Sequence, residues 1–154
     1  MRTYRLGEKF SEVISFKTFI LFLLDESNTL FDPEKQLMYQ SMDHPLTDYF
    51  ICSSHNTYLE SDQLMGNSST HAYQLAFEKG CRCVEIDCWD GENGEPIVYH
   101  GFTLTSKIKF KSVIQTIACF AFKNCEYPLI VSLENHCSYE QQERMAEIIR
   151  LELW

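Results

Sequence analysis

The order of strand-like and helix-like segments after residue 42 is the feature that most limits what this chain can fold into. Short apolar segments with strand character alternate there with longer segments whose apolar residues recur at helical spacing. This alternation predicts an α/β fold in which helices cover a mostly parallel sheet. The expected strands are residues 49–54, 82–89, 97–101 and 127–136, and the expected helices are residues 69–79, 109–122 and 138–154.

Residues 1–41 differ in pattern and are expected to form a short helical segment before this domain. Apolar positions in residues 8–24 follow a helical period, the turn-forming DESN at 25–28 ends it, and a second short helix is expected from Asp32 to Tyr39. The most apolar stretch, FKTFILFLL, is shorter than the roughly 20 residues that span a bilayer. Any contact with a membrane is therefore expected at its surface.

The chain is acidic, with a formal net charge of -9 at pH 7. Such a chain is poorly suited to holding nucleic acid through phosphate contacts. Its 7 cysteines are an odd number for a disulfide scaffold, and the opening MRTYRLGEKF lacks the apolar run of a secretory signal. We therefore expect reduced thiols in a cytoplasmic or nuclear protein that has no nucleic-acid partner.

Polar and ionisable side chains gather where the expected strands end. In parallel α/β sheets and barrels the active site lies at the carboxyl ends of the strands, so four strands that share this feature indicate one site. The residues are His55 and Asn56 after the first expected strand, Glu85 and Asp87 in the second, His100 in the third, and Glu134, Asn135 and His136 in the fourth.

Glu85 and Asp87 belong to a strand of otherwise apolar character, VEIDCW. Side chains alternate between the faces of a strand, so both carboxylates point to one face while Ile86 points to the other. The same alternation turns the nearby Arg82 away from them. Buried acids without a counterion are costly, and a bound cation is the simplest explanation. The alternative is a solvated edge strand with harmless acids.

The candidate ligands offer only oxygen, which indicates the kind of cation. Carboxylate and amide oxygens suit hard cations such as calcium and magnesium more than zinc. Several protein carboxylates in one site favour calcium, because magnesium keeps more of its water. His55 and His100 then remain for acid–base and charge-stabilising chemistry. The candidate calcium ligands are Asn56, Glu85, Asp87 and Glu134.

Some of these residues also have plainer interpretations. His55 lies in SSHNTY, where capping a turn is a fair alternative, and His100 taken alone is more often structural. His136 is expected to pack or to form a turn. A zinc site is not expected, because paired ligand spacing is absent from the cysteine group Cys81, Cys83 and Cys88.

Four long motifs cover most of the chain after residue 42: FICSSHNTYL, GCRCVEIDCWDG, PIVYHGFTLTSKIKFKSVIQTI and YPLIVSLENHCS. They resemble the X half of the catalytic domain of eukaryotic phosphoinositide-specific phospholipase C, and their sequences are most similar to those of the delta and zeta types. Residues 1–41 resemble the tail of the EF-hand lobe that precedes the barrel in this family. DESNTLFD lacks the glycine and the final glutamate of a complete calcium loop.

The resemblance implies a fold, an activity and a setting. The fold is part, about half, of a distorted TIM barrel over residues 42–154. The activity is calcium-dependent hydrolysis of phosphatidylinositol 4,5-bisphosphate to diacylglycerol and inositol trisphosphate in lipid signalling. The protein would act in the cytoplasm, bound peripherally at the inner membrane surface where its phosphoinositide partner lies.

The resemblance also implies a role for each residue that matches a family motif. His55 stabilises charge on the phosphoryl group, His100 is the general acid for the departing diacylglycerol oxygen, and Glu134 is the base toward the inositol 2-hydroxyl. Asp87 can share that role as base. The implied calcium ligands are Asn56, Glu85, Asp87 and Glu134.

Residues 42–154 are enough for only about half of a TIM barrel, which needs about 250 residues. The Y half of the family is missing, and with it the residues that hold the inositol phosphates, so no substrate-binding residue is assigned. We expect an open half-barrel with exposed strand edges that needs the Y half or a protein partner to complete it. The second hypothesis is therefore a truncated, catalytically incompetent fragment that binds calcium or an interaction partner.

Overall fold

The structure of the protein is a computed structural model that describes residues 14–30, 35 and 38–154. The chain divides into two compact units, Met1–Asp48 and Tyr49–Trp154. All the candidate site residues belong to the second unit, so the two units are described separately.

The helix α1 (Phe16–Leu23) is the main described element of the first unit. The Ser15 hydroxyl caps it by accepting a backbone N–H of its first turn at 3.1 Å. The chain leaves the helix at DESN, as predicted. The start of the helix expected over residues 8–24 and most of the helix expected over 32–39 lie outside the described residues. The 3₁₀ helices with described bounds in this unit are η1 (Glu26–Asn28) and η3 (Leu46–Asp48).

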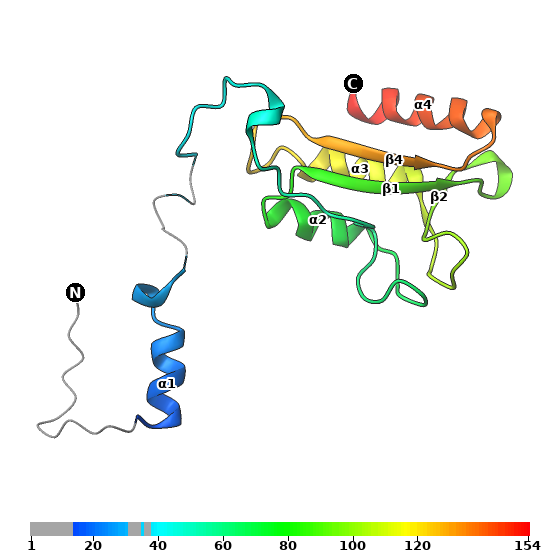
Figure 1. Ribbon diagram of the computed structural model, residues 1–154. Coiled ribbons are helices and arrows are strands. Elements are labelled where there is room, and N and C mark those ends of the chain that lie inside the picture. Colours follow the sequence, from blue (N-terminus) through cyan, green and yellow to red (C-terminus); the bar gives the residue numbers. More distant parts are fainter. Residues whose placement is uncertain (1–13, 31–34, 36–37) are drawn as a thin grey trace, which may run out of the picture. The chain divides into compact units, whose positions relative to one another are not determined.

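The second unit is built on a mixed sheet. Its spatial order is β3 (Ile108–Lys109), β2 (Ile97–Val98), β1 (Cys83–Trp89) and β4 (Ile130–Asn135) (Figure 1). β1 pairs in parallel with β4 along its length and antiparallel with β2 near its end. β2 in turn pairs antiparallel with β3.

The sheet is less parallel than predicted, for a reason that lies in the connections. Residues 90–96, which include the 3₁₀ helix η4 (Glu92–Gly94), are too few for the crossover that parallel strands require, so β2 returns antiparallel to β1. The chain from β1 to β4 is long enough to include α3 (Phe110–Phe120), and that pair is parallel.

Residues 49–54, predicted to be a buried strand, form no regular strand in the described chain. The segment makes one parallel bridge, from Ser53 to Cys83, and the backbone N–H of Ser54 donates to the Cys83 carbonyl at 2.8 Å. The backbone then turns at Asn56, whose φ is 46°. Pairing therefore stops at the start of β1, on the edge opposite β4.

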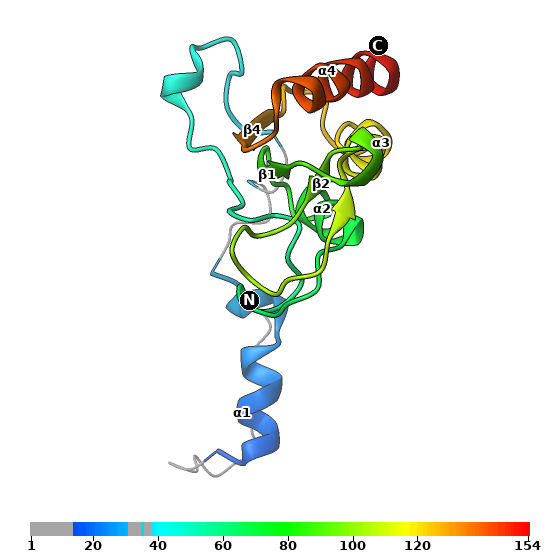
Figure 2. The same cartoon turned by 90° about the vertical axis from the view of Figure 1, so that its right-hand side faces the viewer.

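Three helices pack on the same side of the sheet: α2 (Thr70–Glu78), α3 and α4 (Tyr139–Leu153) (Figures 1 and 2). α3 contacts both of the others. The β1 side chains Val84, Ile86 and Cys88 are fully buried in a core shared with these helices, as strand alternation predicts. Within the described residues, every helix is too short or too polar to cross a bilayer.

β4 lies at the edge of the sheet, and all its residues are exposed. They include the apolar side chains of Ile130, Val131 and Leu133. An unpaired edge of this kind is a template for another strand. The open sheet edge that the sequence predicts is therefore present.

Arg82 ties the start of β1 to the chain that follows α3. Its guanidinium donates to the backbone carbonyls of Ala121, Tyr127 and Pro128. The carbonyl of Ala121, the C-cap of α3, has no intrahelical partner, so the charged donor satisfies it. The prediction that Arg82 turns away from the acids of β1 is confirmed.

Replacing Arg82 with methionine should lower the free energy of unfolding by about 1.5–3 kcal/mol, because charge-assisted hydrogen bonds are lost. Urea denaturation followed by circular dichroism measures the change. Lys111→Met is the matched control, since it removes the exposed Lys111–Glu152 ion pair of 3.4 Å, worth at most about 1 kcal/mol. Equal losses in the two variants would contradict the role assigned to Arg82.

Candidate metal centre

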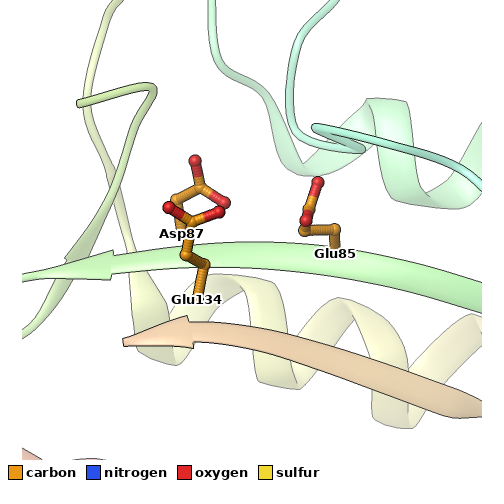
Figure 3. A group of neighbouring side chains, drawn as sticks. All are labelled: Glu85, Asp87 and Glu134. Atoms are coloured by element: carbon orange, nitrogen blue, oxygen red, sulfur yellow. The ribbon is translucent and has the colours of Figure 1, made fainter. Parts of the chain in front are cut away.

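Three carboxylates from two paired strands meet on the face of the sheet opposite the helices. Glu85 and Asp87 project from β1, and Glu134 projects from β4 (Figure 3). The parallel register sets Asp87 directly beside Glu134. One ligand oxygen from each of the three lies within 4.8 Å of the others. The alternation of β1 brings the first two together, and the pairing with β4 adds the third.

Two residues of the loop before α2, Asn56 and Thr57, hold Glu85. Its Oε2 accepts the backbone N–H of Asn56 at 2.7 Å, and its own backbone N–H donates to Oγ1 of Thr57 at 3.0 Å. The hydroxyl of Tyr73, from α2, donates to the Glu85 carbonyl at 2.7 Å. These bonds fix both the backbone and one carboxylate oxygen of Glu85.

Asp87 is buried, with 4% of its surface exposed. Its Oδ2 accepts the Tyr58 hydroxyl at 2.6 Å, while its Oδ1 is buried and has no hydrogen-bond partner among the described residues. Burial raises the pKa of Asp87; the Tyr58 hydrogen bond opposes this, and the neighbouring carboxylates raise the pKa further. A cation would satisfy the unpartnered oxygen and remove the repulsion between like charges.

Asn56, whose backbone N–H binds Glu85, is in the left-handed region that asparagine tolerates better than most residues. Its Nδ2 donates to Oε1 of Gln63 at 3.3 Å, and the Tyr58 hydroxyl lies 3.1 Å from its Oδ1. That hydroxyl has one proton and is closer to Asp87, and burial together with this hydrogen bond raises the pKa of Tyr58. The amide oxygen of Asn56 therefore remains available as a ligand.

The arrangement fits a calcium ion. Calcium takes oxygen ligands at about 2.3–2.6 Å, so two oxygens bound to one ion lie at most about 5 Å apart. The carboxylate oxygens of this site are already within 4.8 Å of one another. The unpartnered Oδ1 of Asp87 and the oxygen-only set of ligands also favour a hard cation such as calcium.

The two candidate acid–base histidines lie beside the carboxylates but are held differently. His55 has a side chain that is 75% exposed, with Nε2 at 3.9 Å from Oε2 of Glu85. His100 is partly buried, with Nδ1 at 2.6 Å from the Gln63 carbonyl. A carbonyl only accepts, so Nδ1 carries a proton and Nε2 is left for proton transfer. His55 thus lies next to Glu85, and His100 is linked to Asn56 through Gln63; their acid–base roles stay predictions.

Three residues hold this site in roles that the sequence pattern did not predict. Tyr58 binds Asp87, Gln63 binds both Asn56 and His100, and His136 binds Glu134. A pattern marked only His136, which lies two positions after Glu134, so that extended backbone places the two side chains on one side. Tyr58 lies in a turn that begins at Asn56, and strand alternation does not relate the two residues. No comparable pattern marks Gln63, which acts from a loop through its side chain and its carbonyl.

Comparison with known proteins links the chain to one family. The family model "Phosphatidylinositol-specific phospholipase C, X domain" matches residues 42–153. The 1-phosphatidylinositol 4,5-bisphosphate phosphodiesterase delta-3-A of Danio rerio is 58% identical over 129 residues, which are 84% of this chain and 16% of that protein. The zeta-1 phosphodiesterase of Bos taurus is 58% identical over 134 residues, 87% of this chain and 21% of that protein. The predicted resemblance to the X half and to the delta and zeta types is confirmed.

Solved structures match the fold over nearly the same part. The crystal structure of PLC21 from L. pealei superposes with a TM-score of 0.76 at 46% identity, covering 87% of this chain and 17% of that one. The crystal structure of PLC21 from S. officinalis superposes with a TM-score of 0.77 at 42% identity, and the match covers 95% of this chain and 19% of that one. The chain thus spans about a fifth or less of the length of its relatives.

Substituting Asp87 with asparagine should stabilise the calcium-free chain at neutral pH. Between the ordinary aspartate pKa of about 3.9 and the raised folded-state value, the folded chain binds more protons than the unfolded chain, so the free energy of unfolding falls as pH rises. Asparagine still accepts the hydrogen bond from Tyr58, and because it does not ionise it removes this fall in the free energy of unfolding. In EDTA, thermal denaturation from about pH 4 to about pH 8 should show a flatter profile for the variant.

Calcium should reverse this ranking. At about 100 times its Kd, calcium stabilises the wild type by about 2.7 kcal/mol, and the Asp87→Asn variant gains less. Glu92→Gln, which removes one exposed acid from η4, is the control for loss of charge alone. A wild type and an Asp87→Asn variant with the same pH profile in EDTA would contradict the assignment.

Proposed function

This chain belongs to the phosphatidylinositol-specific phospholipase C family, and we propose that it provides the calcium-binding and acid–base residues of a phosphoinositide phosphodiesterase. The proposed reaction is hydrolysis of phosphatidylinositol 4,5-bisphosphate to diacylglycerol and inositol trisphosphate. The observation that carries the proposal is the convergence of three carboxylates on the open face of the sheet, with His55 next to Glu85 and His100 held by Gln63.

The proposed architecture is the X half of a distorted TIM barrel over residues 42–154, preceded by the tail of an EF-hand lobe over residues 1–41. A parallel β1–β4 pair with helices on its outer side and acids on its inner side supports this proposal. The acids lie toward the carboxyl ends of these strands, where barrel enzymes place their chemistry. Residues that hold the inositol phosphates would come from the Y half.

The proposed chemistry begins with the inositol 2-hydroxyl, whose proton Glu134 accepts as its oxygen bonds to phosphorus. Calcium bound at the carboxylates would lower the pKa of that hydroxyl and offset the charge that develops on phosphate. The bond from phosphorus to the diacylglycerol oxygen breaks, and His100 donates the proton that this oxygen needs. Water then attacks the phosphorus of the cyclic phosphate, and His100 accepts its proton. The bond from phosphorus to the 2-oxygen breaks, and Glu134 returns its proton to that oxygen. The hydrogen bond from Nδ1 of His100 to Gln63 supports the role of His100, since it leaves Nε2 for transfer.

His55 and the remaining ligands have static roles in this proposal. A cationic His55 at the exposed rim of the site would stabilise negative charge on the phosphoryl oxygens. Asn56, Glu85 and Asp87 would hold the cation together with Glu134. The hydrogen bonds from Tyr58 and from the Asn56 backbone support their preorganisation.

The lipid substrate requires a membrane surface, and two loops beside the site suit that contact. We call their exposed apolar side chains the apolar rim; it consists of Leu64, Met65, Phe102 and Leu104. The backbone N–H of Leu104 donates to the Leu64 carbonyl at 2.8 Å, so the loops are joined. Insertion of the rim into the inner membrane surface would bring the headgroup to the carboxylates and keep the protein peripheral.

A second candidate function is favoured by the exposed β4. All residues of this edge strand are exposed, so the wall of the site beside Glu134 is open to solvent. Catalysis requires a preorganised and supported site. The second candidate is therefore a calcium-binding fragment that does not turn over lipid unless further strands cover this edge.

A chimera tests the catalytic proposal. Residues 42–153 replace the matching segment of the Danio rerio delta-3-A phosphodiesterase, and inositol phosphate release is measured on vesicles with phosphatidylinositol 4,5-bisphosphate and calcium. We expect activity that falls by about 10²–10⁴-fold in His100→Ala, the range for loss of a general acid. His71→Ala, an exposed histidine of α2, should leave activity unchanged.

The same assay on the 154-residue chain separates the two candidates. Release by the chain itself, abolished by His100→Ala, would exclude the non-catalytic fragment. An inactive chimera that is folded and binds calcium would instead overturn the catalytic proposal.

The apolar rim should control vesicle binding. The double substitution Phe102→Ser and Leu104→Ser should weaken binding to phosphoinositide-containing vesicles by about tenfold or more, because each large apolar side chain contributes about 1.5–3 kcal/mol when buried. Phe50→Ser, an equally exposed phenylalanine near the start of β1, is the matched control in sedimentation assays. Equal losses would show that the rim has no special role.

A further inference from the structure

His136 makes a contact that the proposed reaction does not use. Its Nε2 lies 2.9 Å from Oε1 of Glu134. A carboxylate accepts, so the imidazole donates through Nε2. Only one oxygen of Glu134 is engaged in this bond, which leaves the other available to a cation. The sequence predicts packing or a turn for His136, and the hydrogen bond to Glu134 gives it a further role.

Trp89, the last residue of β1, holds the imidazole of His136 in place. The two rings stack with centroids 4.0 Å apart and planes 16° from parallel. Trp89 itself is seated closely on Gly101, where an added Cβ would lie 2.1 Å from Cζ2 of the indole. The ring of Tyr99 also packs against the indole, with the two ring centroids 5.5 Å apart. Residues from β1, from the loop after β2 and from the end of β4 therefore fix one imidazole.

The three carboxylates differ in how much of their position the strands determine. Glu85 and Asp87 lie on the central strand and accept hydrogen bonds from the segment 56–58. Glu134 stands on the edge strand β4 (Figure 3). Its side chain is 56% exposed. An exposed glutamate samples several rotamers, so a cation would have to order it on binding. The hydrogen bond from His136 selects one orientation beforehand.

We propose that His136, clamped by Trp89, is the positioning residue for Glu134. The imidazole holds the carboxylate of the edge strand in the orientation at which a cation can share it with β1. The proposal rests on the calcium site of the proposed function and adds the residue that preorganises its most exposed ligand. Exposed ion pairs contribute little when both side chains must be ordered. Here the stack has already ordered one of them.

Calcium titration of the 154-residue chain by isothermal calorimetry tests the proposal. His136→Phe keeps an aromatic ring for Trp89 and removes the donor, and we expect calcium affinity to fall by about 10–100-fold, the range for lost ligand supports. His136→Gln loses the stack but keeps an N–H donor and should lose less. His71→Phe, which removes the 3.7 Å contact of His71 with Glu60, should leave the affinity unchanged.

A double-mutant cycle shows whether the effect passes through Glu134. In a Glu134→Gln background, His136→Phe should cause little further loss of calcium affinity. The proposal is overturned if His136→Phe alone changes the affinity by less than about twofold, or if its loss is as large with Glu134→Gln as without it. Circular dichroism of each variant establishes that it is folded.

A calcium-free measurement separates this inference from the proposed function. Nitrogen-15 NMR of the neutral His136 ring should show the proton on Nε2, and the signal should change in Glu134→Gln but not in Glu60→Gln. A proton on Nδ1, or a signal indifferent to Glu134, would overturn the positioning role whatever calcium does. Failure of the wild type to bind calcium, with the expected NMR result, would instead overturn the calcium site alone.

Discussion

The parallel pairing of β1 with β4 is the interaction on which both the core and the candidate site depend. On one side of β1 it lays apolar residues such as Ile86 against the helices, and on the other it sets Asp87 beside Glu134. Side chains alternate along a strand, so a shift of one residue would turn the apolar set of a strand to the wrong face. The register of this pair therefore determines that Glu134 stands on the same face as Asp87 and directly beside it.

That register concentrates negative charge, and the surrounding residues limit its cost. Asp87 is buried with one oxygen unpartnered and a raised pKa, which is a destabilising arrangement in a calcium-free chain. Tyr58 and the Asn56 backbone each supply a donor without adding a full positive charge. A nearby lysine would have neutralised the site and reduced its attraction for a cation. The negative charge of the carboxylates is therefore not neutralised by a lysine at the point where a metal would be held.

The supports of the site come from loops and from strand ends rather than from the sheet. Gln63 joins Asn56 to His100, and Trp89 joins His136 to the loop after β2. These contacts cross long distances in sequence, and they matter most at Glu134, whose strand has a neighbour on one side only within the described sheet.

The sequence by itself determined the α/β class, the face shared by Glu85 and Asp87, and the family, because alternation and long local motifs are properties of contiguous residues. It did not determine that residues 49–54 form a bridge instead of a strand, or that β2 returns antiparallel, because these depend on where the chain turns. It also did not reveal what holds the site. The partners of Asp87 and Glu134, and the unpartnered oxygen that fits a cation, exist only once the tertiary structure brings distant segments together, since hydrogen bonds and burial depend on spatial neighbours.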